Sequence, residues 1–224
     1  MRDNIWEAFA QEDAEYYIDT TYQEDQRAFF KSGRFFAKQT MNNALPCLKQ
    51  TKRALEIGCG VGRLTFPHAD VFEEVVAVDI APTMLQKLKE NASKFDYSNI
   101  QPFLADEAWT HKPIDYAYSY LVFQHIQDFH EIENYIKKIA TCLKSDGGVA
   151  QLQFDTRPRS LAYKLRNSLP DWLLSQNQQK GIRRIRRNPE RLEEIFAENN
   201  FEIIRQKDAG TAKHTYLLRK TSSS

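Results

Sequence analysis

The most constraining feature of the sequence is a short stretch in which an apolar run meets three alternating glycines. The run 54–57 (ALEI) indicates a buried strand, and Gly58, Gly60 and Gly62 follow it. Glycine has no Cβ, so such a loop can adopt positive φ angles and bring its backbone close to a ligand. A helix is expected to begin near Arg63, with its first N–H groups pointing back at the loop. Strand, glycine turn and helix N-terminus together predict the nucleotide-binding corner of a doubly wound sheet.

A second apolar run ends in a carboxylate whose sequence separation from this loop is close to that of nucleotide-binding folds. The run 75–78 (VVAV) is continuous, as expected of a strand covered on both faces, and Asp79 closes it 17 residues after Gly62. A carboxylate in this position can accept hydrogen bonds from the hydroxyl groups of a ribose. The strict dinucleotide fingerprint nevertheless fails, because it requires glycine or alanine where this chain has Arg63.

The order of five segments along the chain narrows the set of protein families that the glycine loop can indicate. The segment LEIGCGVGRLT is followed along the chain by VVAVDIAPTML, FLAD, IDYAYSYLVFQHI and LKSDGGVAQLQF. In this order they resemble the class I S-adenosylmethionine-dependent methyltransferases, over residues 51–220. The resemblance implies a transferase with S-adenosyl-L-methionine as cofactor and S-adenosyl-L-homocysteine as product. A catalytically inactive Rossmann-like domain and a sugar-nucleotide enzyme are the other interpretations of the same pattern.

Strand and helix patterns alternate from residue 51 onward, which predicts an α/β fold. We expect a Rossmann-like, doubly wound, mostly parallel seven-stranded sheet, and the resemblance implies that its last strand is antiparallel. Pro67 is expected to shorten or kink the first helix. The predicted strands lie near 53–58, 74–79, 99–105, 113–119, 147–154, 201–207 and 213–220, and the helices near 62–71, 82–93, 129–143 and 189–199.

Residues 1–50 carry no strand pattern and are expected to form an N-terminal helical cap. Aromatic residues at helical spacing predict two or three helices, the last ending at Pro46. The segment can serve as a lid over the cofactor, or its aromatic residues can simply cover the flank of the sheet. The candidate lid residues are Tyr16, Tyr17, Tyr22 and Arg34. The methyltransferase domain then spans 51–220, and 221–224 form a tail.

A helical insertion is predicted at 155–188, between the fifth strand and the last helix. Arginines crowd its end, and two interpretations are open. The insertion can be an anion-binding lid over the active site, or a solvated helical face whose leucines point inward. The arginines are Arg183, Arg184, Arg186, Arg187 and Arg191, and the leucines are Leu161, Leu165 and Leu169.

Composition and cysteine content bear on location and metal binding. The formal net charge of +1 argues neither for nor against a polyanionic partner. The three cysteines (Cys47, Cys59 and Cys142) are widely spaced, so neither a disulfide framework nor a metal site is expected. The chain has no apolar run long enough to span a membrane, and its N-terminus lacks the pattern of a secretory signal. We therefore expect a cytoplasmic location and no membrane partner.

The resemblance assigns roles around the glycine loop. The backbone of Gly58, Cys59 and Gly60 is expected to contact the methionine part of the cofactor, with Glu56 helping to set the loop. Asp79 is expected to bind the ribose hydroxyl groups.

The resemblance also assigns the rest of the cofactor site. Ile80 and Met84 are expected to press on the adenine, and Asp106 to accept a hydrogen bond from its amino group, with Glu107 contributing backbone. Asp106 can alternatively cap a turn or helix, as aspartate often does. Tyr120, at the end of the fourth predicted strand, is expected to converge with these residues.

His125 follows the same strand and is the candidate catalytic residue. Histidine ordinarily titrates near neutral pH, which suits removal of a proton from a hydroxyl or amine group. It can also be a structural residue that hydrogen-bonds the strand edge.

The segment after the fourth strand also bears on the acceptor. It lacks the Asn/Asp-Pro-Pro-Tyr/Phe sequence of many nucleobase methyltransferases, and no appended RNA-binding domain is visible. We therefore predict in-line methyl transfer to an O or N atom of a small molecule, by analogy a sugar or secondary metabolite, and no nucleic-acid partner. An RNA methyltransferase that uses the arginine-rich insertion and a non-catalytic binding module are the alternatives.

Overall fold

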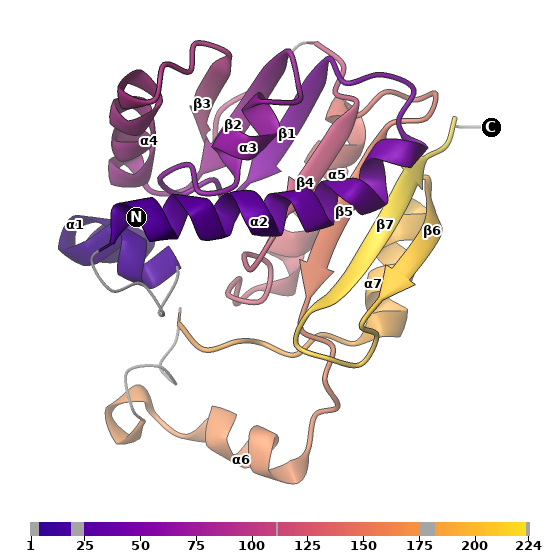
Figure 1. Cartoon of the computed structure of the whole chain (residues 1–224). Coiled ribbons are helices and arrows are strands. Elements are labelled where there is room, and N and C mark those ends of the chain that lie inside the picture. The colour runs from indigo at the N-terminus through magenta and orange to yellow at the C-terminus, as the bar shows by residue number, and fades with distance from the viewer. Residues whose placement is uncertain (1–4, 19–24, 111, 175–181, 223–224) are drawn as a thin grey trace. The chain divides into compact units, whose positions relative to one another are not determined.

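The computed structural model describes residues 5–18, 25–110, 112–174 and 182–222 (Figure 1). The lid candidate Tyr22 and the end of the predicted tail, 223–224, lie outside these residues. The chain divides into two compact units. The first comprises Met1–Tyr118 and Cys142–Val149, and the second comprises Ser119–Thr141 and Ala150–Ser224.

Seven strands form one sheet in the order β3-β2-β1-β4-β5-β7-β6. β1 runs parallel to β2 and β2 parallel to β3, whereas the last strand, β7, runs antiparallel to β6. The predicted α/β class and the antiparallel last strand are confirmed. The strands are β1 (Arg53–Ile57), β2 (Glu74–Asp79), β3 (Ile100–Leu104), β4 (Tyr116–Ser119), β5 (Val149–Phe154), β6 (Phe201–Lys207) and β7 (His214–Lys220).

The register of the first three strands brings their carboxyl ends to one edge. Ile57 pairs with Val78, which in turn pairs with Phe103 on β3. Asp79 pairs with Leu104, the last residue of β3. Within the first unit, the loops that follow β1, β2 and β3 therefore open side by side, which is where parallel sheets bind their ligands.

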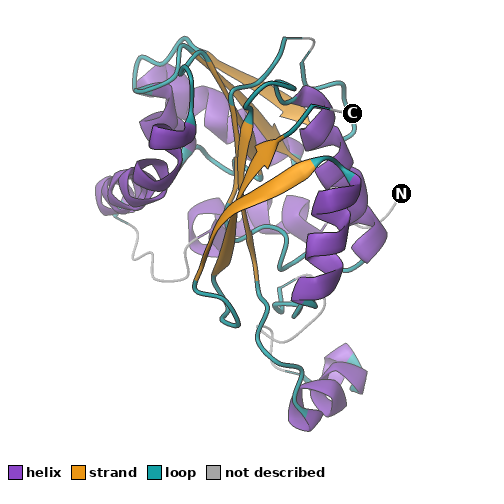
Figure 2. Cartoon of the chain, turned by 90° about the vertical axis from the view of Figure 1, so that its right-hand side faces the viewer, coloured by secondary structure: helices purple, strands orange, loops and turns teal. Residues whose placement is uncertain are grey.

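The helices that follow the strands begin and end close to the predicted residues, except for the first, which is shorter, as Pro67 led us to expect. The first, α3, has only five residues, and Pro67 lies in its first turn; a helix beginning near residue 62 would have needed the backbone N–H that Pro67 lacks. Figure 2 distinguishes the strands (orange) from the helices (purple) that pack on them. The helices are α3 (Thr65–Ala69), α4 (Pro82–Lys94), α5 (Phe129–Cys142) and α7 (Pro189–Glu198).

The described residues of the N-terminal segment are largely helical, as predicted, and the first helix is kinked at Asp13. The helices are α1 (Ile5–Ile18) and α2 (Gln26–Ala44), and a short 3₁₀ turn, η1 (Leu45–Cys47), contains Pro46. The carboxylate of Asp25 caps α2 by accepting hydrogen bonds from two backbone N–H groups, 3.0 and 3.1 Å away. Such a cap satisfies donors that have no partner inside the helix.

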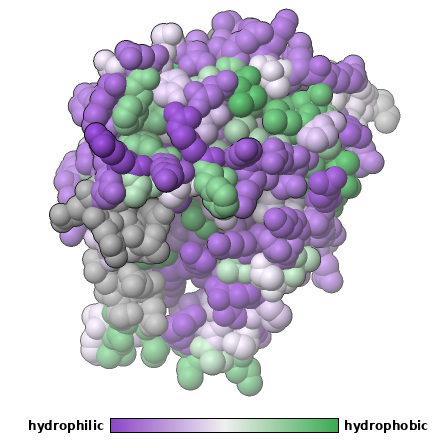
Figure 3. Space-filling model, viewed as in Figure 1, coloured by the Kyte–Doolittle hydropathy of each residue, from purple (hydrophilic) through white to green (hydrophobic). Residues whose placement is uncertain are grey.

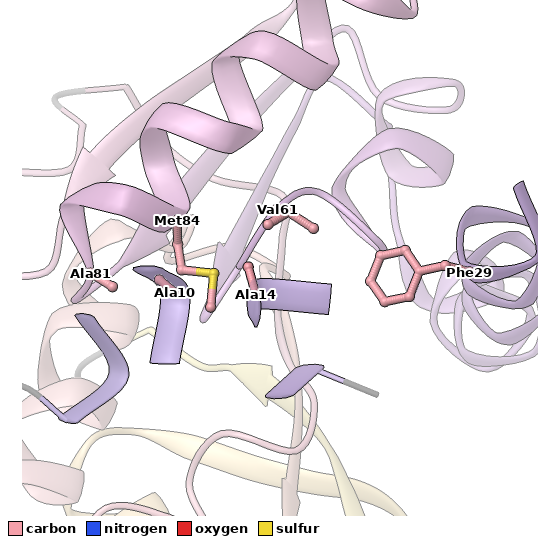
Figure 4. Close-up of a cluster of buried hydrophobic side chains, with 6 residues drawn as sticks. All are labelled: Ala10, Ala14, Phe29, Val61, Ala81 and Met84. Carbon is pink, nitrogen blue, oxygen red and sulfur yellow. The ribbon is translucent and has the colours of Figure 1, made fainter. Parts of the chain in front are cut away.

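The two N-terminal helices cover different parts of the first unit. On α1, Ala10 and Ala14 are fully buried against Val61 of the glycine loop and Met84 of α4 (Figure 4). On its first turn, α1 also presents a Glu7 carboxylate that accepts a hydrogen bond from the Thr83 backbone N–H, 3.0 Å away. α1 therefore packs at the edge of the sheet where the loops open.

α2 instead packs on the flank. Phe30 lies 5.5 Å from Phe66 and 5.1 Å from Phe95, measured between ring centroids. Arg34 forms an ion pair with Asp70 and donates to the Tyr97 hydroxyl, 2.8 Å away. Arg34, one of the candidate lid residues, therefore anchors α2. The flank-covering interpretation describes α2, and the lid interpretation is left for α1.

The leucines of the insertion do not point inward, so that expectation was wrong. The insertion contains α6 (Leu161–Ser168) and a 3₁₀ turn, η2 (Asp171–Leu173). Leu161 is 84% exposed, Leu165 69% and Leu169 39%. Figure 3 shows hydrophobic surface on the lowest segment, where Figure 1 places α6. Helical spacing alone shows that these leucines share a face, but not whether anything covers that face.

Candidate active site

The glycine loop after β1 has the backbone conformation that its sequence predicts. Gly58, Gly60 and Gly62 have φ angles of +77°, +52° and +101°. The loop is held by Val78 of β2, whose carbonyl oxygen accepts hydrogen bonds from the N–H groups of Gly58 and Cys59 at 2.7 and 3.1 Å. A residue with a side chain is strained at positive φ, so glycine allows the chain to turn tightly here.

Asp79 links this loop to the turn that follows β2. Its Oδ2 accepts a hydrogen bond from the backbone N–H of Gly60 at 2.9 Å, and its Oδ1 accepts one from the N–H of Ala81 at 3.0 Å. The side chain is 9% exposed, and this burial raises its pKa above the ordinary 3.8. A carboxylate held by two backbone N–H groups is oriented before any ligand arrives.

Glu56 lies beneath the loop and is buried. Its Oε2 accepts hydrogen bonds from the Thr65 hydroxyl at 2.6 Å and from the Tyr118 hydroxyl at 2.9 Å. Thr65 is the first residue of α3 and Tyr118 lies on β4, so one carboxyl oxygen joins three elements of the first unit. Burial raises the pKa of Glu56 from 4.5 to about 8.

The raised pKa of Glu56 predicts a pH-dependent stability. The folded chain retains a proton on Glu56 that the unfolded chain loses above about pH 4.5, so stability falls as the pH rises from there to about 8. In Glu56→Gln this contribution is absent. We expect the urea unfolding midpoint of wild type to drop relative to that of Glu56→Gln as the pH rises from about 4.5 to about 8, and to stay level above that.

The control for this titration is Glu73→Gln, which removes an exposed carboxylate of the same unit. Its midpoint should follow that of wild type across the same pH range. Parallel midpoints for wild type and Glu56→Gln would show that Glu56 is ionised throughout.

The other predicted cofactor residues of the first unit occupy different environments. Cys59 is 4% exposed and its thiol is free, and burial raises its pKa well above 9.0. Met84 is 2% exposed and packs with α1, whereas Ile80 is 44% exposed. Asp106 lies exposed in the turn after β3.

Glu107, rather than Asp106, caps the turn after β3. Its Oε2 accepts a hydrogen bond from the Leu104 backbone N–H at 2.8 Å. Trp109, which the sequence patterns did not single out, is 2% exposed and donates from its indole nitrogen to the Ala105 carbonyl oxygen at 3.2 Å. These two contacts hold the turn in which Asp106 lies.

The second unit carries the remaining predicted residues, Tyr120 and His125, on the loop that follows β4. Both are half-buried. Leu121 between them has a φ of +61°, an unusual value for a branched side chain. Its backbone N–H donates to Oε1 of Gln153 on β5 at 2.9 Å. Neither feature has a sequence signature, since no glycine or asparagine marks the left-handed residue.

His125 is held by its neighbours on this loop. Its backbone N–H donates to the Val122 carbonyl oxygen at 2.9 Å, which closes a turn. Its Nε2 lies 3.1 Å from Nε2 of Gln124, a residue that is 2% exposed. An amide nitrogen can only donate, so this contact places an acceptor lone pair on Nε2 of His125. That lone pair is engaged by Gln124, so Nε2 can take up a proton only when this contact opens.

Metal ligation and membrane spanning have no support within the residues that the structure describes. No group of three or more His, Cys, Asp or Glu side chains among them could hold a metal ion. None of the described helices is long and apolar enough to cross a membrane.

Comparison with known proteins decides the family. The model of the methyltransferase domain family matches residues 22–206. The chain belongs to this family. The predicted identity as a class I S-adenosylmethionine-dependent methyltransferase is thereby confirmed, with S-adenosyl-L-methionine as its cofactor. The structure fits such a group, because a glycine loop at positive φ and an oriented carboxylate lie at the carboxyl ends of β1 and β2, beneath Ile18 of α1.

Solved structures of methyltransferases share the fold over most of their length. The magnesium protoporphyrin IX methyltransferase of Synechocystis PCC 6803, with bound S-adenosylhomocysteine, has a TM-score of 0.66 and 18% identity, covering 98% of this chain and 99% of that one. An amino pentose methyltransferase from Micromonospora echinaspora has a TM-score of 0.66 and 14% identity, covering 89% and 98%. An S-adenosylmethionine-dependent methyltransferase from Clostridium acetobutylicum has a TM-score of 0.65 and 17% identity, covering 98% and 100%.

A curated relative matches over a short segment only. The 23S rRNA (uracil(1939)-C(5))-methyltransferase of Pseudomonas savastanoi pv. phaseolicola is 38% identical over 55 residues. This match covers 25% of the chain but spans only 12% of that relative's length.

Proposed function

We propose that this enzyme transfers a methyl group to an oxygen or nitrogen atom of a small molecule. The observation that carries the proposal is the loop after β4, where the side chain of Gln124 contacts Nε2 of the half-buried His125. Structures of similar size whose names specify a porphyrin or an amino pentose substrate match almost end to end, which supports a small acceptor. A sugar or secondary-metabolite hydroxyl or amine fits this chemistry.

The first unit would bind the cofactor. We assign the methionine part to the backbone of Gly58, Cys59 and Gly60, with Glu56 setting the loop beneath them. Asp79 would accept from the ribose hydroxyl groups through lone pairs that Gly60 and Ala81 do not use, since each carboxylate oxygen can accept more than one hydrogen bond.

The adenine would lie between the turns after β2 and β3. Ile80 is exposed enough to contact it directly, and Asp106 lies exposed in the second turn, where it can accept from the amino group. Met84 is buried against α1, so its contact would require a shift of that helix or would act from beneath. Glu107 would contribute backbone, as its carboxylate already holds the turn.

α1 supports the proposed division into a helical cap (1–50) and a methyltransferase domain (51–220). Its residue Ile18 reaches the glycine loop so closely that a Cβ on Gly60 would lie 2.6 Å from Cδ1 of Ile18. A segment that covers the loop in this way can shield the cofactor from water, which is the role proposed for the cap.

Methyl transfer needs little from the protein beyond alignment, because the cofactor supplies an electrophilic methyl group on a sulfonium. We assign to Nε2 of His125 the removal of the acceptor proton, with the acceptor hydroxyl or amine displacing the Gln124 amide from the lone pair of Nε2. Tyr120, five residues earlier on the same loop, would line the acceptor side. Gln124 would keep the imidazole in the required orientation.

His125→Gln should slow methyl transfer about 10²–10⁴-fold, the usual contribution of a general base. The affinity for S-adenosylhomocysteine should stay unchanged, since the change lies outside the proposed cofactor residues. His130→Gln is the matched control, because His130 is exposed and pairs with Glu133 on α5. Initial-rate assays with a confirmed acceptor measure the rate of methyl transfer. Equal rates for wild type and His125→Gln would show that His125 has no part in the mechanism.

The acceptor class is tested by transfer of a radioactive methyl group. Purified enzyme and methyl-labelled S-adenosylmethionine are incubated separately with a small-metabolite extract and with total RNA. Label recovered in the small-metabolite fraction supports the proposal. Label in RNA that is lost after nuclease treatment supports the alternative, which the short match to an rRNA methyltransferase favours. RNA methylation should also weaken steeply as salt is raised.

A further inference from the structure

We propose that the insertion binds the surface of an anionic lipid membrane through the exposed apolar side chains of α6 and η2. The inference concerns the second unit alone and goes beyond the proposed function, because it names a partner that methyl transfer does not require. The expectation of no membrane partner came from the absence of a run long enough to span a membrane. A segment that lies on a membrane surface needs no such run.

Both elements of the insertion expose large apolar side chains. Besides Leu161 and Leu165 of α6, Trp172 is 80% exposed and Leu173 is 55% exposed on η2. Figure 3 shows hydrophobic surface (green) on this segment. Single exposed apolar residues are normal on a soluble protein, whereas several within one short segment mark a surface for a partner.

The contacts of α6 fix which of its faces is covered. Tyr163 is 6% exposed, and its hydroxyl accepts a hydrogen bond from the Arg186 backbone N–H at 3.0 Å. The guanidinium of Arg186 lies 4.4 Å from the centroid of the Tyr163 ring. Successive residues of an α-helix are rotated by about 100°, so Leu161 and Leu165, each two residues from Tyr163, lie about 160° away from it. The covered face of α6 is therefore opposite its leucines.

Further hydrogen bonds hold α6 in this orientation. Nε and Nη2 of Arg159 donate to the carbonyl oxygen of Arg186 at 3.0 and 2.7 Å, and Arg186 donates to the carbonyl oxygen of Pro158. The Ser160 hydroxyl caps the helix by accepting from the Tyr163 backbone N–H at 3.2 Å. The apolar face is thus presented by a folded segment, and binding requires no ordering of α6.

The charge of the insertion indicates what kind of surface would cover this face. Residues 156–189 contain nine lysines and arginines but only one acid, Asp171. Lys164 and Arg166 are exposed and adjoin Leu165, so they lie about 100° to either side of it around α6. Their long side chains can place positive charge at lipid head groups while Leu165 enters the apolar layer. Apolar residues flanked by basic ones favour an anionic membrane.

A second copy of the chain is a poorer match for this charge. Pairing α6 with α6 of another molecule would bring Lys164 and Arg166 of both copies together, and like charges across an interface repel.

A shaped groove on another protein is also a poorer match than lipid. A helix bound in a groove uses anchors along one continuous helix. Here the apolar side chains belong to α6 and, beyond Pro170, to the separate turn η2. A fluid lipid surface accepts such side chains without a matching shape, and tryptophan is favoured at the boundary between lipid and water.

Binding is tested with vesicles of defined composition. The full-length protein is mixed with vesicles of phosphatidylcholine and anionic phosphatidylglycerol, or of phosphatidylcholine alone, and the bound fraction is measured by sedimentation. Wild type should bind the anionic vesicles more tightly, and added salt should weaken this binding. Leu165→Gln should weaken it at least about tenfold, because a leucine no longer enters the lipid. Phe35→Gln removes a side chain that is 68% exposed on α2 and should bind as wild type.

The charge contribution has its own matched pair of variants. Lys164→Gln should weaken binding to anionic vesicles about fivefold and leave binding to phosphatidylcholine unchanged. Lys213→Gln removes an equally exposed lysine on the turn before β7 and should bind as wild type. Equal losses in the two variants would show that binding reports the net charge of the protein rather than α6.

Tryptophan fluorescence reports whether the insertion itself enters the lipid. Trp109 is 2% exposed and Trp6 is half-buried, so Trp172 is the tryptophan with most to lose from contact with water. The emission of wild type should shift to shorter wavelength on anionic vesicles. Trp172→Phe should still bind but show no such shift.

Three outcomes would overturn the proposal. Wild type that fails to bind anionic vesicles, or binds them no better than Leu165→Gln does, would show that α6 does not meet lipid. A fluorescence shift that persists in Trp172→Phe would place the contact elsewhere. A dimer in lipid-free buffer that Leu165→Gln abolishes would assign the apolar face to a second copy.

Methyl transfer is measured in parallel to keep the two proposals separate. Leu165 is exposed, so Leu165→Gln should keep the thermal unfolding midpoint of wild type and its rate with a water-soluble acceptor. Absence of vesicle binding together with methylation of a small molecule would leave the proposed function standing. Vesicle binding through Leu165 together with methylation of RNA alone would leave only the membrane surface standing.

Discussion

Replacing Gly62 with alanine is expected to destabilise the protein by about 2–5 kcal/mol. Its φ of +101° is strained for any residue with a side chain, which costs about 1–2 kcal/mol. A Cβ would also lie 2.6 Å from Cζ of Phe66 and 2.8 Å from Cδ1 of Leu88. Overpacking of this kind costs about 1–3 kcal/mol.

Gly210→Ala separates these two contributions. Gly210 has a φ of +74°, yet a Cβ there meets nothing within 4 Å. Gly210→Ala should therefore lower the free energy of unfolding only by the cost of the strained backbone, about 1–2 kcal/mol. Urea denaturation followed by circular dichroism measures both variants. Equal losses at the two positions would show that α3 and α4 can move to make room for a side chain at Gly62.

Replacing Asp79 with asparagine is expected to weaken binding of S-adenosylhomocysteine about 10–100-fold. Loss of a charged acceptor for the ribose hydroxyl groups costs about 1.5–3 kcal/mol. Asparagine also has only one acceptor oxygen, whereas the carboxylate now serves the N–H groups of both Gly60 and Ala81. The loop should consequently lose order as well as affinity.

Calorimetric titration at a temperature where both proteins are folded measures this effect. Glu73→Gln, a neutralised exposed carboxylate of the same unit, serves as the control and should bind as wild type does. Unchanged affinity in Asp79→Asn would mean that Asp79 only braces the loop, and the ribose would need another partner.

The glycine loop after β1 and its hydrogen bond to Asp79 were predictable as neighbours because the sequence signals for them are local. Alternating glycines, two apolar runs and an acid at the end of the second run specify the loop and its neighbour within about thirty residues, a usual length for one strand–helix–strand unit. The proline in α3 likewise acts through its own missing N–H, so the late start of this helix followed from one residue.

The side-chain contacts that hold the glycine loop and the loop after β4 were less predictable, since they depend on partners far along the chain. Glu56 is joined to Tyr118, 62 residues away, and Leu121 is held by Gln153, 32 residues away. No local sequence pattern predicts such pairs. The left-handed leucine is the clearest case, because its strain is offset by a contact that only the folded sheet supplies.

The insertion at 155–188 shows most plainly what could not be predicted from the sequence. Its charge and helical periodicity were evident from the sequence, but the inward orientation expected for Leu161 and Leu165 was wrong. The separation of Arg159 and Arg186, which are bonded to the backbone, from Arg183, whose Nε and Nη1 have no acceptor among the described residues, also appears only in the structure.

The sequence by itself determined the α/β class, the methyltransferase family and the conformation of the glycine loop, because each depends on residue order and on short-range backbone preferences. The tertiary structure decided which groups are buried together and which of them find partners. Burial sets the pKa of Glu56 and leaves two nitrogens of Arg183 without acceptors among the described residues. Both effects come from removing water around a charge, and that removal depends on packing between segments distant in the chain.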